Sequence, residues 1–323
     1  MQTADGRPIL LAVVGQTATG KSALALSVAV QLGGEIINCD STAVYRGFDI
    51  GTDKVPPSKR RGIPHHLIDV VEPTEVYSAA RYARDAARLV RDATARDRLP
   101  VVVGGTGLYY RALTRGLFQG PGRDPALRAR LGRLARRWGV EALHRLVARY
   151  DPDSAHRIQP RDEKRLIRAA EVYLLTGRPL TAHFAGTRSP ITDYKVVTVS
   201  LRLPGAVLEA RIAHRVDQQF TGGLLDEVRG LLAAGVPSDV GPFGGLVYRQ
   251  ALEHLRGVRD EVATRELIVR ENRRYARRQL IWFRKEPNVQ WLDDPGERLE
   301  TCSAVIRKLD AIRRLSPDPG SSW

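Results

Sequence analysis

Gly15-Gln16-Thr17-Ala18-Thr19-Gly20-Lys21-Ser22 directly follows the apolar run at residues 9–14 and precedes a helix-forming stretch at 23–30. A short strand, a glycine-rich turn and a helix in this order are typical of a phosphate-binding P-loop. The glycines let backbone N–H groups surround phosphate oxygens, and the helix N-terminus adds its dipole. Lys21 is expected to reach the phosphates and the Ser22 hydroxyl to ligate Mg²⁺. An ordinary strand-to-helix turn needs neither side chain, so the stretch predicts a phosphate site without specifying the reaction.

The composition favours a globular protein with a nucleic-acid partner. The chain has 323 residues, 43% of them hydrophobic, and a net charge of +15. This length is enough for about two domains. Nearly all of the excess charge is arginine, which pairs with phosphate through two hydrogen bonds and stacks on bases. A nucleic acid is therefore the leading partner, and an arginine-rich, high-GC genome is the alternative origin of the charge.

Cysteine usage and hydropathy indicate the compartment. Cys39 and Cys302 are the only cysteines, too few for a disulfide framework or a zinc site. Cys39 ends an apolar run and is expected to pack as a small hydrophobe. No stretch approaches the roughly 20 apolar residues of a membrane span, and the run before the P-loop is too short for a signal peptide. We expect a cytoplasmic monomer with no membrane partner.

The first 115 residues alternate strand and helix patterns. Strands are predicted at 9–14, 35–39, 66–71 and 101–103, with helices at 21–32, 78–96 and from 107 onward. This alternation predicts an α/β fold whose parallel sheet is covered by helices on both faces. Because ligands of such sheets bind at the carboxyl ends of the strands, we expect the P-loop, Asp40 and the segment 104–106 to converge on one crevice.

The pattern changes at Gly120-Pro121-Gly122, and residues 124–177 read as helical throughout. We therefore predict a P-loop α/β core at 1–120, an all-helical insertion domain at 121–190, a mostly helical completion of the core at 191–315 and a flexible tail at 316–323. The insertion contains 15 Lys and Arg against 7 Asp and Glu. Its net charge is about half of the whole excess, which suits a basic surface for RNA.

Two polar residues follow strands next to the P-loop. Asp40 ends the second strand, where its carboxylate can bind Mg²⁺ or act as a general base, a role typically worth about 10²–10⁴ in rate. The alternative is a helix N-cap, since Ser and Thr follow it. Thr106 comes after two glycines and a buried strand. Its hydroxyl suits a phosphate or nucleotide contact and an N-cap equally well.

Arginines recur at one-turn spacing in two predicted helices. One helix, at 259–285, carries Arg270, Arg274 and Arg277, and the other carries Arg211 and Arg215. Such stripes suit RNA phosphates, but the spacing alone slightly favours a solvated helix surface.

Further motifs follow the P-loop along the chain. They are Asn38-Cys39-Asp40-Ser41, Gly47-Phe48-Asp49-Ile50-Gly51-Thr52-Asp53-Lys54, Pro64-His65-His66-Leu67-Ile68-Asp69, Val103-Gly104-Gly105-Thr106-Gly107, Arg165-Leu166-Ile167-Arg168-Ala169 and Tyr275-Ala276-Arg277-Arg278-Gln279. Together they resemble the tRNA dimethylallyltransferases, in order over about residues 9–292. The chain departs from that pattern at Val247, where the family usually has glycine before a Tyr-Arg pair. A backbone contact at Val247 is therefore not carried over.

The resemblance implies both a reaction and the residues that carry it. Such enzymes transfer a dimethylallyl group from its diphosphate to N6 of adenosine 37, in tRNAs reading codons that begin with U. The implied diphosphate site is Gly15, Gln16, Thr17, Ala18, Thr19, Gly20, Lys21 and Ser22, with Mg²⁺ on Ser22. The implied catalytic residues are Asp40 as general base, Lys21 and Arg215. Contacts with the tRNA anticodon stem-loop are implied at Asp40, Ser41, Thr42, Ala43, Thr106, Arg128, Lys164, Arg165, Leu166, Ile167 and Arg168.

Three other functions fit parts of the sequence. A P-loop kinase of a small metabolite or nucleotide shares the loop and the aspartate after the second strand, but no compact arginine-bearing lid motif is evident. A non-catalytic RNA-binding protein would bind RNA without Lys21 or Asp40. A prenyltransferase acting on free adenylate would not need the basic insertion. An assay that compares phosphoryl transfer from ATP with label transfer from dimethylallyl diphosphate distinguishes the kinase from the transferase.

Overall fold

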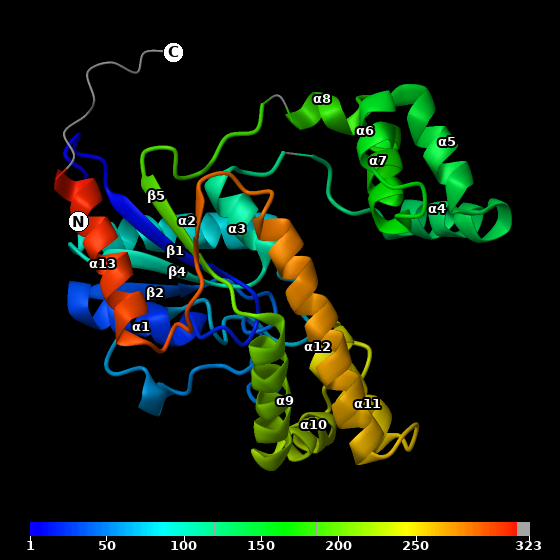
Figure 1. Ribbon diagram of the computed structural model, residues 1–323. Coiled ribbons are helices and arrows are strands. Elements are labelled where there is room, and N and C mark those ends of the chain that lie inside the picture. Colours follow the sequence, from blue (N-terminus) through cyan, green and yellow to red (C-terminus); the bar gives the residue numbers. More distant parts are fainter. Residues whose placement is uncertain (119, 185, 315–323) are drawn as a thin grey trace. The chain divides into compact units, whose positions relative to one another are not determined.

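The computed structural model describes residues 1–118, 120–184 and 186–314 (Figure 1), and the tail predicted at 316–323 lies outside them. The chain divides into two compact units. The core unit is Met1–Thr114 together with the chain from Pro190 onward, and the helical unit is Arg115–Ser189. The helical unit thus begins before the predicted residue 121. Gly116 explains this boundary, because it packs against the backbone of Arg188, a long-range contact that no local pattern shows.

The core unit contains a six-stranded parallel sheet, which confirms the predicted fold class. The strands are β1 (Ile9–Gly15), β2 (Gly34–Asn38), β3 (His65–His66), β4 (Leu99–Gly104), β5 (Lys195–Leu201) and β6 (Val289–Leu292). Their order is β3-β2-β4-β1-β5-β6, and every pair is parallel. The strand that leads into the P-loop is therefore central, and the ends of β2 and β4 lie on one side of it.

Helices cover both faces of the sheet, as Figure 1 shows. They include α1 (Lys21–Leu32), α2 (Ala79–Ala95), α3 (Gly107–Thr114) and α13 (Leu299–Arg314). Leu10 and Val14 of β1 pack in the layer formed with α2 and α3, whereas Leu11 and Val13 pack in the layer with α1 and α13. This period of two is that of an extended strand. Full burial of each such side chain contributes about 1.5–3 kcal/mol.

The strand predicted at 66–71 is wrong beyond its first residue. Leu67 and Asp69 have φ values of 59° and 56°, in the left-handed region where an extended strand cannot continue. Pairing with β2 therefore stops at His66, and Val71 forms only an isolated bridge with Tyr45.

Four further helices and two 3₁₀ turns complete the core unit. They are α9 (Gly205–Thr221), α10 (Leu224–Ala233), α11 (Leu246–Leu255), α12 (Glu261–Phe283), η1 (Pro57–Lys59) and η2 (Gly241–Gly244). The four helices and η2 share one apolar cluster, in which Phe48 lies edge-on to Phe243 and Tyr248 at centroid distances of 5.0 and 4.8 Å. At the other end of α12, Phe283 joins the layer of α2 and α3. Helix α12 thus connects this cluster to the sheet.

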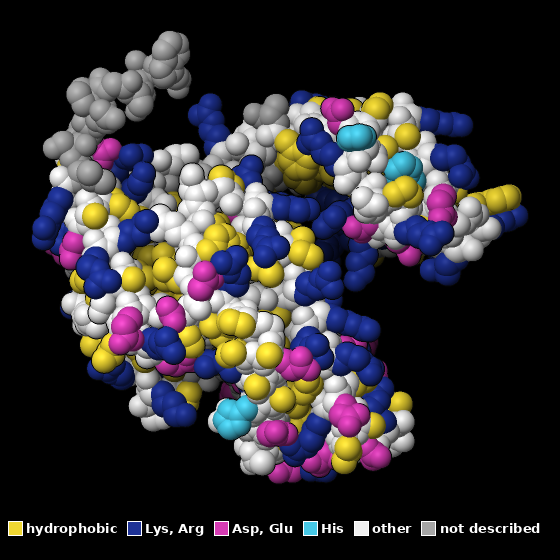
Figure 2. All heavy atoms as spheres, in the orientation of Figure 1, with side chains coloured by type: hydrophobic (Ala, Val, Ile, Leu, Met, Phe, Trp, Pro, Cys, Tyr) yellow, Lys and Arg dark blue, Asp and Glu magenta, His cyan; other side chains and the backbone are white. Residues whose placement is uncertain are grey.

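The helical unit has its own core. Its helices are α4 (Pro125–Trp138), α5 (Val140–Tyr150), α6 (Pro152–Arg157), α7 (Glu163–Thr176) and α8 (Leu180–Phe184). Buried Leu143, Val147 and Leu166 belong to one apolar cluster. In the view of Figure 2, Lys and Arg side chains gather on this unit and acidic ones are few. Across the parts of the chain that the structure describes, no helix is long and apolar enough to cross a bilayer.

Candidate active site

The P-loop forms a cradle of unpaired backbone donors. Gly15 and Gly20 adopt φ values of 119° and 88°, which glycine reaches without steric cost. A Cβ on Gly15 would lie 2.5 Å from the Ser200 hydroxyl. The N–H groups of residues 19–23 donate to no acceptor within the described part of the chain. Free donors at a helix start attract an anion, so this geometry fits the predicted phosphate site.

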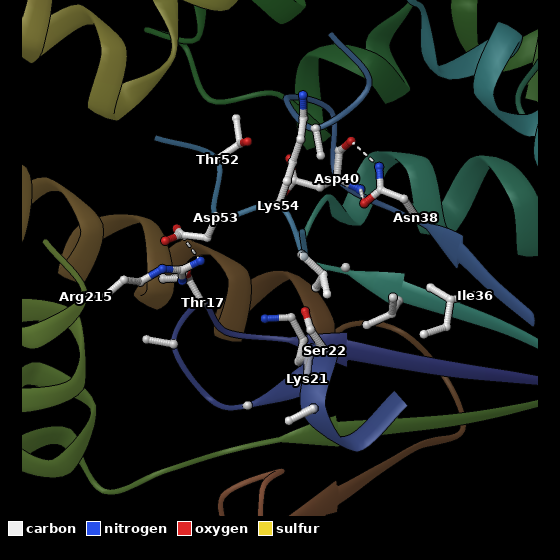
Figure 3. Close-up of a pocket in the computed structure, with 18 of the residues that line it drawn as sticks. Thr17, Lys21, Ser22, Ile36, Asn38, Asp40, Thr52, Asp53, Lys54 and Arg215 are labelled. Carbon is white, nitrogen blue, oxygen red and sulfur yellow. Dashed lines mark hydrogen bonds and ion pairs between the residues drawn. The ribbon is translucent and has the colours of Figure 1, made fainter. Parts of the chain in front are cut away.

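Lys21 and Ser22 line a cavity of about 620 Å³ in front of the cradle (Figure 3). The Lys21 ammonium donates to the Gln16 carbonyl oxygen. Burial, followed by the charge of Arg215, lowers the pKa of Lys21 to about 7, while Asp40 opposes the shift. The cavity therefore holds a lysine whose charge depends on pH near neutrality and on the presence of an anion.

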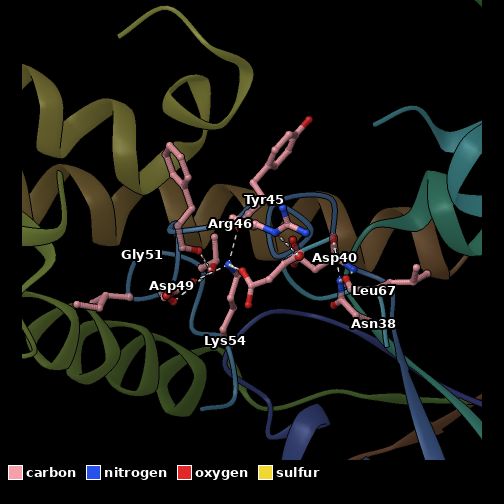
Figure 4. Close-up of polar contacts among 12 residues, drawn as sticks. Asn38, Asp40, Tyr45, Arg46, Asp49, Gly51, Lys54 and Leu67 are labelled. Atoms are coloured by element: carbon pink, nitrogen blue, oxygen red, sulfur yellow. Dashed lines mark hydrogen bonds and ion pairs between the residues drawn. The ribbon is translucent and has the colours of Figure 1, made fainter. Parts of the chain in front are cut away.

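Asp40 lines the same cavity, just beyond the end of β2. Its backbone is fixed from both sides by Asn38, whose amide accepts from Asp40 N and donates to Asp40 O, both at 3.1 Å (Figure 4). Its Oδ1 accepts from Thr42 N at 2.8 Å and from Thr42 Oγ1 at 2.6 Å. Its Oδ2 accepts no hydrogen bond from any residue that the structure describes. Asp40 thus caps a turn rather than a helix, with one carboxylate oxygen available to a substrate.

A buried lysine holds the segment that follows Asp40. Lys54 donates at 2.6 Å to the Tyr45 carbonyl oxygen and to Asp49 Oδ1, and it also contacts Asp69 (Figure 4). Its side chain is only 4% exposed. These contacts fix the loop that carries residues 41–53 along the cavity.

Arg215 reaches the cavity from α9. It donates to Thr17 Oγ1 at 2.6 Å and forms an ion pair with Asp53. Gln219, one turn further along α9, donates to Asp53 at 2.9 Å. Burial raises the pKa of Asp53, against the opposing effect of Arg215. Asp53 belongs to a quoted motif, but its contact with a helix more than 160 positions away was not predictable from spacing.

A second cavity of about 530 Å³ adjoins the first and shares part of its lining. Residues common to both are Thr17, Asp40, Thr52, Asp53, Arg215 and Tyr275. Segment 244–249 and α12 form much of the rest of its wall, and exposed Arg274 and Arg278 belong to it. Of the three arginines predicted as a stripe on this helix, Arg274 therefore borders a cavity, whereas Arg270 and Arg277 line neither cavity. Val247 also lines it, packed in the cluster of Phe48 and Tyr248.

Thr106 lies beside Ser41, next to this wall. Its Oγ1 accepts from Ser41 N at 3.0 Å, and its carbonyl oxygen accepts from Tyr109 N and Tyr110 N in the first turn of α3. The side chain therefore bridges the β2 and β4 ends. Ala43 is buried but lines the first cavity, and Thr42 lines the second.

The remaining predicted RNA contacts lie in the helical unit. Arg128 and Arg168 both bind Glu171, at 2.7 and 2.6 Å, and the Glu171 side chain is fully buried. Although burial opposes the shift, these hydrogen bonds lower the pKa of Glu171 to about 2. Residues 164 and 165 are exposed, at the start of α7. The side chain of Leu166 lies in the core of the unit, so an RNA contact in this segment must come from its neighbours.

The residues at this site fit a magnesium ion only if substrate phosphates and water supply most of its ligands. The Ser22 hydroxyl is exposed in the first cavity, where Asp40 and Asp53 also lie. The described residues contain no group of three or more His, Cys, Asp or Glu able to hold a metal. Mg²⁺ is commonly held by one or two protein oxygens, substrate phosphates and water. The chemistry of this donor set suits an ion that arrives with a diphosphate.

The chain is similar to a group of tRNA-modifying enzymes. Residues 43–286 match the family model described as IPP transferase. The tRNA dimethylallyltransferase of Solibacter usitatus is 48% identical over 304 residues, covering 93% of this chain and 97% of that protein. The enzyme of the same description from Geobacter metallireducens is 43% identical, covering 92% and 96%.

Solved structures agree with these relatives. The tRNA isopentenylpyrophosphate transferase of Bacillus halodurans has a TM-score of 0.70 and 35% identity, covering 95% of this chain and 97% of that one. A eukaryotic dimethylallyltransferase acting on tRNA has a TM-score of 0.78, covering 94% of this chain and 79% of that one. Its identity of 24% makes this a likeness of fold alone.

Proposed function

Because this chain belongs to the IPP transferase family, we propose that it transfers a dimethylallyl group from dimethylallyl diphosphate to N6 of adenosine 37 in tRNA, releasing diphosphate. The tRNAs are those reading codons that begin with U, and the protein acts as a cytoplasmic monomer. The observation that supports this most is the position of Asp40. Its carboxylate lines both the cavity at the P-loop and the cavity beside the basic helix α12.

The donor occupies the first cavity. Its diphosphate lies on the free N–H groups of the P-loop, with Lys21 and Arg215 beside it. Such a cradle recognises phosphate oxygens rather than the group attached to them, so an allylic diphosphate fits as well as a nucleotide would. Arg215 then exchanges part of its contact with Asp53 for the new anion.

The acceptor enters through the second cavity. A base stacked in an RNA loop cannot reach a recessed carboxylate, so adenosine 37 must leave its stack, at a cost of a few kcal/mol. Arg274 and Arg278 border this cavity and suit the phosphates that flank an extruded base. The helical unit carries exposed Lys164 and Arg165 for the anticodon stem.

The chemical step is a substitution at the allylic carbon. The N6 nitrogen forms a bond to C1 of the dimethylallyl group, while the bond from C1 to the diphosphate oxygen breaks. Asp40 Oδ2 accepts the proton that N6 loses, since Oδ1 is held by Thr42. The leaving diphosphate gains negative charge, which the loop N–H groups, Lys21 and Arg215 stabilise in fixed positions. When Mg²⁺ is bound, Ser22 would hold it, and the ion would supply further positive charge to the diphosphate.

The test is a transfer assay on the purified full-length protein. With labelled dimethylallyl diphosphate and a tRNA containing A37, we expect label in the RNA and N6-dimethylallyladenosine among its nucleosides by mass spectrometry. A tRNA with guanosine at position 37 is the matched control and should stay unlabelled. Absence of transfer, together with phosphorylation of a small acceptor from ATP, would support the kinase instead.

A further inference from the structure

Two buried glutamines connect the P-loop to α12 in opposite directions. Gln16, in the loop, donates through Nε2 to the Ala276 carbonyl oxygen at 3.3 Å. Gln279, on the helix, accepts through Oε1 from Thr17 N at 2.8 Å. Both side chains are 5% exposed. A loop that must present several backbone donors to one anion is thus fixed to a helix that begins elsewhere in the core unit.

The Gln279 amide also contacts a second strand end. Its Nε2 donates to the Gly105 carbonyl oxygen at 3.0 Å, just beyond β4. A Cβ on Gly105 would lie 2.1 Å from this nitrogen, so the bare glycine leaves the room that the amide occupies. The site needs an acceptor and a donor from one planar group, which glutamine supplies and glutamate, leucine or lysine does not.

The residue that Gln279 holds belongs to both cavities. Thr17 lines each of them. Its side chain accepts from Arg215 of α9, and its N–H donates to Gln279 of α12. One turn before Gln279, Tyr275 also lines both cavities. Gln279 therefore determines where the loop lies relative to the β4 end and to the wall of the second cavity.

We propose that Gln279 is a positioning residue for prenyl transfer, which fixes the P-loop through Thr17 so that the diphosphate lies in line with the acceptor cavity. This inference deepens the proposed function and rests on it. Gln279 itself lines the first cavity, but both ends of its amide are taken by Thr17 N and Gly105 O, so in this scheme it binds neither substrate. Its effect is transmitted through Thr17 and Gly105, so substitutions should change donor binding and turnover while leaving RNA affinity unchanged.

The first experiment compares Gln279→Leu with Gln250→Leu. Gln250 is a matched control, because its amide is also buried and bonded twice, to Arg259 and Glu271, without contacting the P-loop. Binding of inorganic diphosphate is measured by calorimetry on the full chain. We expect Q279L to weaken it about tenfold, the order expected for two lost neutral hydrogen bonds, and Q250L to leave it within twofold. Equal effects of both variants, or none from Q279L, would overturn the proposal.

A second variant keeps the test decisive if Q279L does not fold. In Q279E the new carboxylate accepts from Thr17 N but cannot donate to Gly105 O, and it does both once protonated. Burial raises the pKa of a carboxyl, so the ratio of Q279E to wild-type kcat/KM should rise as the pH falls from 8 to 6. RNA affinity should stay constant. A ratio that is flat with pH contradicts the positioning role.

These readouts separate two failures. Binding of inorganic diphosphate requires no prenyl transfer, so it tests Gln279 even if wild-type protein forms no product. A wild type without product removes the proposed reaction, whereas a Q279L variant that binds diphosphate normally removes only the role of Gln279.

Discussion

Asp40→Asn isolates proton transfer from every other role of the residue. The asparagine keeps an oxygen for the two hydrogen bonds from Thr42, at 2.8 and 2.6 Å. Asp40→Ala should also lose most turnover while still binding tRNA. It removes both bonds to the carboxylate as well, at about 1.5–3 kcal/mol each, so loop disorder would contribute to its effect. The conservative substitution leaves the turn and removes only the base.

The expected size follows from the geometry. Oδ2 is the oxygen without a partner among the described residues, and it becomes an N–H₂ group that cannot accept the N6 proton. A positioned base contributes about 10²–10⁴ in rate, or about 2.7–5.4 kcal/mol of activation free energy. We therefore expect kcat to fall by that factor. Donor affinity should not fall, because a negative charge leaves a cavity that binds an anion.

The assay is the initial rate of transfer at saturating donor and RNA, with RNA affinity measured separately by fluorescence anisotropy. Asp49→Asn is the matched control, since Asp49 lies on the same loop, pairs with Lys54 and lines neither cavity. It should change kcat less than twofold. A D40N variant that retains more than a tenth of wild-type kcat would refute Asp40 as the base.

Two further predictions concern proton uptake by Lys21 and the stability of the helical unit. Burial and Arg215 lower the pKa of Lys21 to about 7, and we expect a bound anion to raise it again. Above pH 7, diphosphate binding should therefore take up a proton, and the affinity for diphosphate should fall by up to tenfold per pH unit. Calorimetry in two buffers of different ionisation enthalpy measures this proton uptake. Lys21→Arg should abolish the uptake. If the wild-type protein takes up no proton, the lowered pKa of Lys21 is contradicted. In the helical unit, Glu171→Leu leaves Arg128 and Arg168 without their buried partner, a loss of about 3–5 kcal/mol. The melting temperature of the Glu171→Leu variant should fall. Glu141→Gln, which changes an exposed ion pair, is the control and should leave the melting temperature unchanged. Equal melting temperatures of the two variants would count against a stabilising role of the buried network.

Local patterns predicted the elements that local physics determines. The strand at 9–14 and the helix at 21–32 agree with β1 and α1 to within one residue, since apolar runs and flanking glycines specify them. The strand at 66–71 failed because residues 67 and 69 adopt positive φ. Such backbone is rare outside glycine, so no propensity argument anticipates it there.

The candidate site was predictable to the extent that it follows from sheet topology. A parallel sheet brings the ends of β1, β2 and β4 to one edge, which is why Lys21, Asp40 and the 104–106 segment were expected together. The residues that hold the site in place, Arg215 and Gln279, come from α9 and α12 instead. Gln279 belongs to a quoted motif, but it lies 262 positions from Thr17, and no local pattern shows that its amide contacts the loop. The same holds for Glu171, whose two arginine partners define its role.

The charge balance of the cavity explains how one pocket can both hold and release an anion. Lys21 and Arg215 share the first cavity with Asp40 and Asp53, and Arg215 pairs directly with Asp53, so without substrate the cations already have carboxylates near them. Burial raises the pKa of Asp53 and lowers that of Lys21, so it opposes the charged form of both groups. In the proposed reaction, a proton on Lys21 or a cation near Ser22 would compensate the charge of the diphosphate. That charge is released with the product, so the proposal predicts an affinity for diphosphate that depends on pH and on divalent cations.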